Sequence, residues 1–179
     1  MREPGVTIWL TGLSGAGKST ISALLHKQLL DMDRRVEVLD GDEVRRNLSA
    51  GLGFSKADRD INVRRIGYVC RLLSRNGVIA ISAAISPYRA IREELRLSIP
   101  DFLEIYIDCP LNICIDRDVK GLYKRALRGE IPAFTGVSDP YEAPLKPDLH
   151  IRTDQEAPEE SARRVVDLLI DKGYIARPE

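Results

Sequence analysis

The sequence has 179 residues, about the size of one ordinary domain, and 44% of them are hydrophobic, which is enough to bury a single core. Because 27 basic residues balance 27 acidic residues, the chain has no overall basic field, and we expect neither a nucleic-acid partner nor a membrane partner. The longest strongly apolar run, residues 78–85, is too short to span a bilayer and the first residues lack the layout of a signal peptide, so we predict a cytoplasmic protein with one domain over residues 1–179.

The first predicted elements are a buried strand over residues 6–10 and a helix over residues 19–30, joined by a glycine-rich loop. The loop sequence, Gly-Leu-Ser-Gly-Ala-Gly-Lys-Ser, matches the P-loop pattern G-x-x-x-x-G-K-[ST] without a mismatch. A strand, a glycine loop and a helix in this order favour a phosphate site over a glycine-rich turn with a chance lysine. The residues predicted to bind the cofactor nucleotide are Gly12, Leu13, Ser14, Gly15, Ala16, Gly17, Lys18, Ser19 and Thr20.

Two of these residues have predicted chemical roles. Lys18 is expected to reach the β- and γ-phosphates, and the Ser19 hydroxyl is expected to ligate Mg²⁺. The P-loop therefore predicts a nucleoside triphosphate and Mg²⁺ as the cofactors of the chain.

A pair of acidic residues follows the second predicted strand, residues 35–39. Asp40 and Asp42 would lie at the carboxyl end of a strand next to the P-loop strand, in the crevice where open parallel sheets bind ligands. The alternative is that Asp42 is the N-cap of the helix that follows. Both roles are compatible, and we expect an acid here to act near the metal and the reacting hydroxyl.

A long helix is predicted over residues 55–75, after a loop that carries Phe54. Arg59, Asn62 and Arg65 recur at three-residue spacing and therefore share one face of this helix. A solvated face is the common explanation for such a row, and a binding face is the alternative.

The following elements alternate between strands and helices. Strands are expected over residues 78–85, 102–108 and 148–152, and helices over residues 90–97, 110–117 and 158–172. The first of these strands is continuously apolar, as is typical of the interior of a parallel sheet. Cys70, Cys109 and Cys114 lack metal-ligand spacing and are predicted to be reduced core residues.

Residues 118–146 break this alternation. The segment is long, irregular and basic, is punctuated by glycine and proline, and carries one isolated aromatic residue, Phe134. Such a segment inside a compact domain is usually a functional lid or disordered, and its basic charge favours a lid that closes over phosphates.

Five successive strand-helix units predict an α/β fold of the P-loop NTPase (nucleotide-kinase-like) type, with a five-stranded parallel sheet, helices on both faces and a lid segment. The sequence has no Asn-Lys-x-Asp motif for guanine, and no acid ends the strand at 78–85. Together with the basic lid, these features favour a small-molecule kinase over a switch or a motor.

Several sequence blocks, taken together with the P-loop, resemble the adenylylsulfate kinase (APS kinase) family in the family's order. They are residues 39–42, 51–55, 58–65, 85–89 and 118–144. The resemblance implies the phosphorylation of the ribose 3′-hydroxyl of adenosine 5′-phosphosulfate (APS) by ATP, which gives ADP and 3′-phosphoadenosine 5′-phosphosulfate (PAPS), the second step of sulfate activation.

The resemblance also implies the substrate residues. They are Asp40, Gly41, Asp42, Glu43, Arg45, Phe54, Arg59, Asn62, Ile85, Ser86, Lys120, Ala133 and Phe134, with Phe134 stacking on the substrate adenine. The catalytic set is Lys18, Asp42 and Ser86, and the metal ligands are Ser19 and Asp42. The family is described with a phosphoserine at the position of Ser86, but nothing beside Ser86 in sequence is a base, so we expect direct in-line transfer instead.

The resemblance further implies a homodimer, either free-standing or fused to or associated with ATP sulfurylase. Two other functions stay open. Another small-molecule kinase would leave the cluster of Phe54, Arg59 and Asn62 unexplained. A regulatory nucleotide-binding domain is expected to lose Lys18, Asp42 or the lid cations, and the sequence retains them.

Overall fold

The computed structural model describes residues 4–177, so residues 1–3 and 178–179 of the predicted domain lie outside the described residues. Within the described range, the strands form one parallel sheet: β1 (Val6–Thr11), β2 (Val36–Asp40), β3 (Ile79–Ala83), β4 (Phe102–Asp108) and β5 (Leu149–Arg152). The helices are α1 (Lys18–Asp31), α2 (Gly41–Asn47), α3 (Lys56–Ser74), α4 (Arg89–Ser98), α5 (Leu111–Arg117), α6 (Leu122–Leu127) and α7 (Pro158–Asp171).

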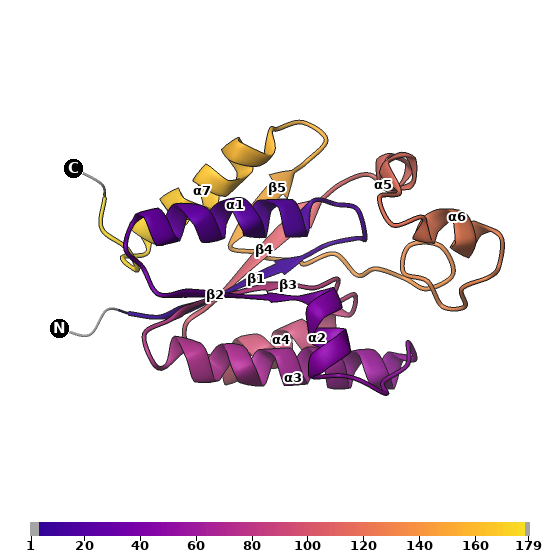
Figure 1. The fold of residues 1–179 in the computed structure, drawn as a ribbon, viewed down its shortest axis with the longest axis horizontal. Helices are drawn as coiled ribbons and strands as arrows, with labels where there is room; N and C mark the ends of the chain where they lie inside the picture. Colours follow the sequence, from indigo (N-terminus) through magenta and orange to yellow (C-terminus); the bar gives the residue numbers. More distant parts are fainter. Residues whose placement is uncertain (1–3, 178–179) are drawn as a thin grey trace.

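Helices cover both faces of the sheet, as the sequence predicted. Figure 1 shows α1 and α7 on one face and α2, α3 and α4 on the other. The strand residues alternate between the two layers. Ile8 and Leu10 of β1 pack in a core cluster that includes α1 and α7, whereas Trp9 packs in a cluster that includes α3 and α4. The predicted P-loop kinase fold is therefore confirmed.

The strand order is β2-β3-β1-β4-β5, which places β1 in the middle of the sheet. The prediction that the strand carrying Asp40 lies next to the P-loop strand is wrong, because β3 lies between β2 and β1. The register still aligns their ends. Asp40 of β2 and Leu10 of β1 both pair with Ala83 of β3, so Asp40 reaches the level at which the P-loop begins.

Two local details also differ from the sequence-based expectation. The N-cap of α2 is Asp40, whose carboxylate accepts a hydrogen bond from the Asp42 amide at 3.0 Å. The alternative interpretation, that Asp42 is the N-cap, is wrong because the helix begins one residue before it, at Gly41. The lid segment is not wholly irregular, since α6 forms within it after Gly121, which has a φ of 66°.

Two further expectations concern the cysteines and membrane crossing. Cys70, Cys109 and Cys114 are buried free thiols, as predicted. Within residues 4–177, no helix combines the length and the apolar character that crossing a bilayer requires.

Candidate active site

The P-loop connects β1 to α1, and glycines shape its backbone. Gly15 (φ 75°) and Gly17 (φ 111°) have left-handed conformations, which residues with a Cβ rarely adopt. Gly17 is the N-cap of α1 and makes no side-chain cap. The positive end of the α1 dipole is therefore presented to an anion without competition from a capping side chain.

Lys18 lies at the start of α1 and is buried, with 8% of its surface exposed. Its Nζ donates hydrogen bonds to the carbonyl oxygens of Gly12 at 2.8 Å and Leu13 at 2.7 Å. Burial lowers the pKa of Lys18 to about 8, because the charged form loses its contact with water. An anion bound at the P-loop would stabilise the ammonium form that burial disfavours.

Ser19 and two acidic residues lie beside the P-loop. The Ser19 hydroxyl donates to Asp40 Oδ2 at 2.9 Å, whereas the Asp42 carboxylate forms an ion pair with Lys120 of the lid. Residues 4–177 contain no cluster of three acidic, histidine or cysteine ligands. A magnesium ion bound with a nucleotide needs only one or two protein ligands, because phosphates and waters supply the others. The hydroxyl and carboxylate oxygens at this position therefore fit Mg²⁺, and Asp40 is the acid in direct contact with Ser19.

A large cavity of about 1300 Å³ opens at the carboxyl ends of the strands. Most of the sequence-predicted site residues line it: Ser14, Gly15, Gly17, Lys18, Ser19, Thr20, Asp40, Gly41, Asp42, Arg45, Phe54, Arg59, Asn62, Ile85, Ser86, Lys120, Ala133 and Phe134. Four predicted residues do not line it: Gly12, Leu13, Ala16 and Glu43. The first three belong to the P-loop, and Glu43 has an exposed side chain.

Arg45 and Phe54 form one wall of this cavity. The Arg45 guanidinium carbon lies 4.7 Å from the centroid of the Phe54 ring, and Arg45 Nη1 donates to the Gly53 carbonyl at 2.7 Å. The Phe54 side chain is 61% exposed, which is unusual for a large aromatic residue. A cation and an exposed aromatic face are suited to an anionic group and a flat ring.

Arg59 and Asn62 of α3 face inward, so the solvated-face interpretation is wrong for these two residues. Arg59 is 8% exposed and Asn62 is 7% exposed, and both line the cavity. Arg65, on the same predicted face, is exposed and donates to the Leu48 carbonyl at 3.0 Å. The row therefore divides into two buried polar residues at the cavity and one surface residue.

The Ser86 hydroxyl points into the sheet. It accepts a hydrogen bond from Trp9 Nε1 at 3.0 Å and donates to Thr11 Oγ1 at 3.1 Å. Ser86 is 3% exposed, has a φ of 44°, and its hydroxyl contacts no histidine or carboxylate. This environment holds the side chain in place and offers no base to activate it as a nucleophile.

The lid packs onto the P-loop through Tyr123 and Phe134. The Tyr123 hydroxyl donates to the Ser14 carbonyl at 2.8 Å, and the ring meets the Phe134 ring edge to face with centroids 5.1 Å apart. Phe134 follows Ala133, which has a φ of 51°, and is 9% exposed. These contacts hold the lid segment against the P-loop.

Sequence reasoning missed four lining residues beside the P-loop. They are Arg117, Thr153, Glu156 and Pro158, which lie at the end of α5, in the turn after β5 and at the first residue of α7. Arg117 Nη2 donates to the Thr153 carbonyl at 2.9 Å, and Arg117 Nη1 donates to the Gly15 carbonyl at 3.2 Å. Because ligands bind outside the carboxyl ends of parallel strands, the position of Thr153 after β5 was the available signal.

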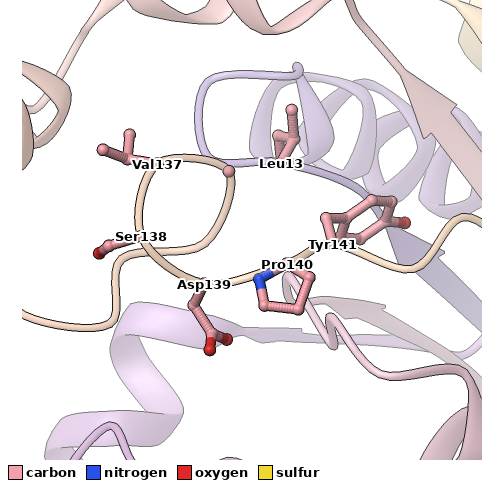
Figure 2. A pocket seen from close by; sticks show the side chains of 7 residues that line it. Leu13, Val137, Ser138, Asp139, Pro140 and Tyr141 are labelled. Carbon is pink, nitrogen blue, oxygen red and sulfur yellow. The ribbon is translucent and has the colours of Figure 1, made fainter.

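A second, smaller hollow of about 530 Å³ lies beside the P-loop. Figure 2 shows Leu13 of the P-loop facing a loop of the lid segment that runs from Val137 to Tyr141. The Asp139 carboxylate points away from Leu13 in this view. The hollow therefore marks where the end of the lid passes the P-loop.

The chain is similar to known proteins in both sequence and fold. The family model described as adenylylsulphate kinase matches residues 4–152. A protein named adenylyl-sulfate kinase from Rippkaea orientalis is 57% identical over 178 residues, which cover 99% of this chain and 98% of that protein. A probable bifunctional SAT/APS kinase from Sorangium cellulosum is 55% identical over 97% of this chain, but only 30% of its own length is matched.

A solved structure is also closely similar. The Mycobacterium tuberculosis APS kinase CysC, solved in complex with AMPPNP and APS, superimposes with a TM-score of 0.88 and is 44% identical. The match covers 93% of this chain and 98% of that chain. The family model, the full-length relatives and the shared structure lead to one conclusion: the chain belongs to the adenylylsulphate kinase family.

Proposed function

We propose that this chain is an adenylyl-sulfate kinase, which transfers the γ-phosphoryl group of ATP to the ribose 3′-hydroxyl of APS and so makes PAPS and ADP. The observation that carries this proposal is that one and the same cavity is lined by the P-loop and by Phe54, Arg59 and Asn62. One end suits a triphosphate, and the other suits an anionic adenine nucleotide. A kinase needs both substrates in one enclosure.

The donor half of the cavity, formed by the P-loop and the turn after β5, binds ATP. The P-loop amides and Lys18 hold the phosphates, and Ser19 with Asp40 or Asp42 holds Mg²⁺. These oxygens would hold Mg²⁺, which would supply positive charge against the negative charge that develops during transfer. Arg117 and Thr153 line this half and donate to P-loop carbonyls, and the base of ATP would extend toward them from the phosphates.

The acceptor half, formed by Arg45, Phe54, Arg59, Asn62 and Phe134, binds APS. Arginine guanidinium groups suit phosphate and sulfate oxygens, and the two aromatic rings suit the faces of adenine. The AMPPNP and APS complex of the Mycobacterium tuberculosis relative supports this pairing of ligands. The main chain at Ile85 and Ser86 completes the floor of this half.

The transfer itself is direct and in line in this proposal. Asp42 orients the 3′-hydroxyl and accepts its proton, and Lys18 stabilises the negative charge on the transferring group. Lys120, which contacts Asp42, brings a lid cation to the same place when the lid closes. Ser86 acts through its main chain and its fixed position, because its hydroxyl is occupied by Trp9 and Thr11.

The test is ADP release from MgATP by the purified chain, with APS set against nucleosides, other nucleotides and shikimate. We expect turnover with APS and a product with the mass of PAPS. Turnover confined to another acceptor would support a different small-molecule kinase. ATP binding without turnover for any acceptor would support a regulatory domain instead.

Two further properties belong to this proposal. Three buried free thiols fit the reducing cytoplasm, where we place the chain. We also propose a homodimer, and mass measurement in solution tests it. The relationship to a bifunctional SAT/APS kinase supports an association with ATP sulfurylase.

A further inference from the structure

Arg59 is held in the acceptor half by groups of the protein itself. Its Nε donates to the Phe54 carbonyl at 2.9 Å, and its Nη2 donates to the Ala133 carbonyl of the lid. Its Nη1 contacts the Thr135 hydroxyl and the Asp139 carboxylate, the latter at 3.2 Å. The guanidinium therefore fastens the lid loop that carries Phe134 onto α3.

Asp139 is in turn held by Tyr88. The Tyr88 hydroxyl donates to Asp139 Oδ2 at 2.6 Å, the same oxygen that Arg59 contacts. Tyr88 is 5% exposed, and burial together with this hydrogen bond raises its pKa to about 12, so it remains a donor in any ordinary assay. Figure 2 shows that the Asp139 carboxylate points away from Leu13 and the P-loop, so it does not face the donor half.

These contacts join three segments that surround the acceptor half. Tyr88 lies just after Ser86 and Pro87, Asp139 lies near the end of the lid, and Arg59 lies on α3. The Arg59 side chain is 10% exposed and the Asp139 side chain is 22% exposed, so water and salt screen this pair less than an exposed pair. Loss of one member would free Arg59 to adopt other rotamers.

We propose that Tyr88 and Asp139 are positioning residues that fix the Arg59 guanidinium, and with it the lid loop of residues 133–139, for the binding of the acceptor nucleotide. Neither residue touches the reacting groups in this scheme. The inference rests on the proposed function, in which Arg59 binds the anionic part of APS. The inference adds that Tyr88 and Asp139, which lie outside the acceptor half, raise the affinity for APS.

Steady-state kinetics of Asp139→Asn, Tyr88→Phe and the double variant test the proposal. We expect Asp139→Asn to raise the KM for APS about tenfold, which corresponds to about 1.4 kcal/mol, with little change in kcat or in the KM for ATP. Tyr88→Phe should have a smaller effect in the same direction. The double variant should be no worse than Asp139→Asn alone, because Tyr88 acts through Asp139. Calorimetric titration with APS repeats the comparison without turnover.

The chain offers a matched control pair at the opposite end of the sheet. The Tyr174 hydroxyl donates to Asp101 Oδ1 at 3.0 Å, outside the cavity. Tyr174→Phe and Asp101→Asn should leave both KM values unchanged. A KM for APS that stays within twofold of wild type in the Asp139 and Tyr88 variants would overturn the inference, and so would equal losses for APS and ATP.

Two outcomes, a variant that does not fold and a wild type that uses another acceptor, are distinguished from failure of the inference. If Asp139→Asn does not fold, Tyr88→Phe decides alone, because it removes only one hydroxyl. If the wild type phosphorylates an acceptor other than APS, the proposed function fails, and the same variants are compared with that acceptor.

Discussion

The protonation state of Lys18 links its burial to the pH dependence of ATP binding. The pKa of Lys18 is lowered to about 8, chiefly by desolvation and also by the charge of Lys120, while Asp40 and Asp42 oppose the shift. A P-loop lysine binds phosphate as a cation. The free protein should therefore lose this cation as the pH rises through 8.

The first prediction is a pH profile for ATP. We expect kcat/KM for ATP to be level below about pH 8 and to fall above it, by up to about tenfold per pH unit, because this ratio reports the free enzyme. The kcat should fall only at higher pH, because bound phosphates raise the pKa of Lys18. Initial rates between pH 6.5 and pH 10 measure both quantities. A kcat/KM that stays level to pH 10 would mean that the lysine remains charged in the free protein.

The second prediction separates Ser86 from the residues of direct transfer. Lys18→Ala and Asp42→Ala should each lower kcat by about a hundredfold to a thousandfold, because each removes charge or base from the transition state. Ser86→Ala should lower kcat by less than about tenfold, because the hydroxyl is bonded to Trp9 and Thr11 and to no reacting group. The lost hydrogen bonds, each worth about 1 kcal/mol, should lower the stability instead. Complete loss on Ser86→Ala, with a phosphoserine trapped in the wild type, would contradict direct transfer.

At the scale of elements, the lid is tied to the P-loop by one hydrogen bond from α6. The Tyr123 hydroxyl donates to the Ser14 carbonyl at 2.8 Å, which couples lid position to the shape of the ATP site. We predict that Tyr123→Phe lowers kcat/KM for ATP about fivefold, the effect of about 1 kcal/mol, with a small change in Tm. Tyr68→Phe is the control, because Tyr68 on α3 is 63% exposed. A fall in Tm with unchanged kinetics would show that the bond serves stability only.

The elements themselves were largely predictable from sequence, because apolar periodicity and glycine positions act locally. The P-loop was the clearest case, since its glycines, lysine and serine belong to one short stretch. The alternative that Asp42 is the N-cap of α2 was wrong. Asp40 and Asp42 are both acceptable N-caps, and the choice depends on where the chain leaves β2. The prediction that β2 lies next to β1 was also wrong, because strand order depends on contacts between distant segments.

The cavity residues were likewise predictable where the signal is local in the sequence, and not where it depends on contacts between distant segments. Arg59 and Asn62 gave a helical spacing that fits a solvated face equally well, yet both are buried, and Arg59 contacts the lid. The contacts of Arg59 with Thr135 and Asp139 join residues more than 70 positions apart, and no spacing rule predicts them. The family resemblance supplied what the periodicity left open.

At the scale of the whole molecule, a buried ion pair joins the sheet to the helix layer and to the lid. Arg92 of α4 is 1% exposed and donates from Nε to Glu104 of β4 at 2.9 Å. Arg92 Nη1 also donates to the Ser86 carbonyl at 2.6 Å, and Arg92 Nη2 donates to the Glu142 carbonyl. One side chain thus fixes β4, the Ser86 turn and the end of the lid.

The last prediction concerns the stability of this arrangement. Glu104→Met leaves Arg92 buried without its carboxylate and should lower the free energy of unfolding by about 3–5 kcal/mol, a large part of the roughly 5–15 kcal/mol of a typical domain. Arg92→Met should cost less, because Glu104 keeps a second partner, Arg96, at 3.2 Å. The double variant should be no less stable than Glu104→Met, since no unpaired charge remains. Urea unfolding measures all three variants, and Asp31→Ala, which breaks the exposed pair with Lys27, should change stability by less than about 0.5 kcal/mol. A Glu104→Met variant as stable as that control would mean that Arg92 is held by the two carbonyl groups alone and that its charge needs no partner.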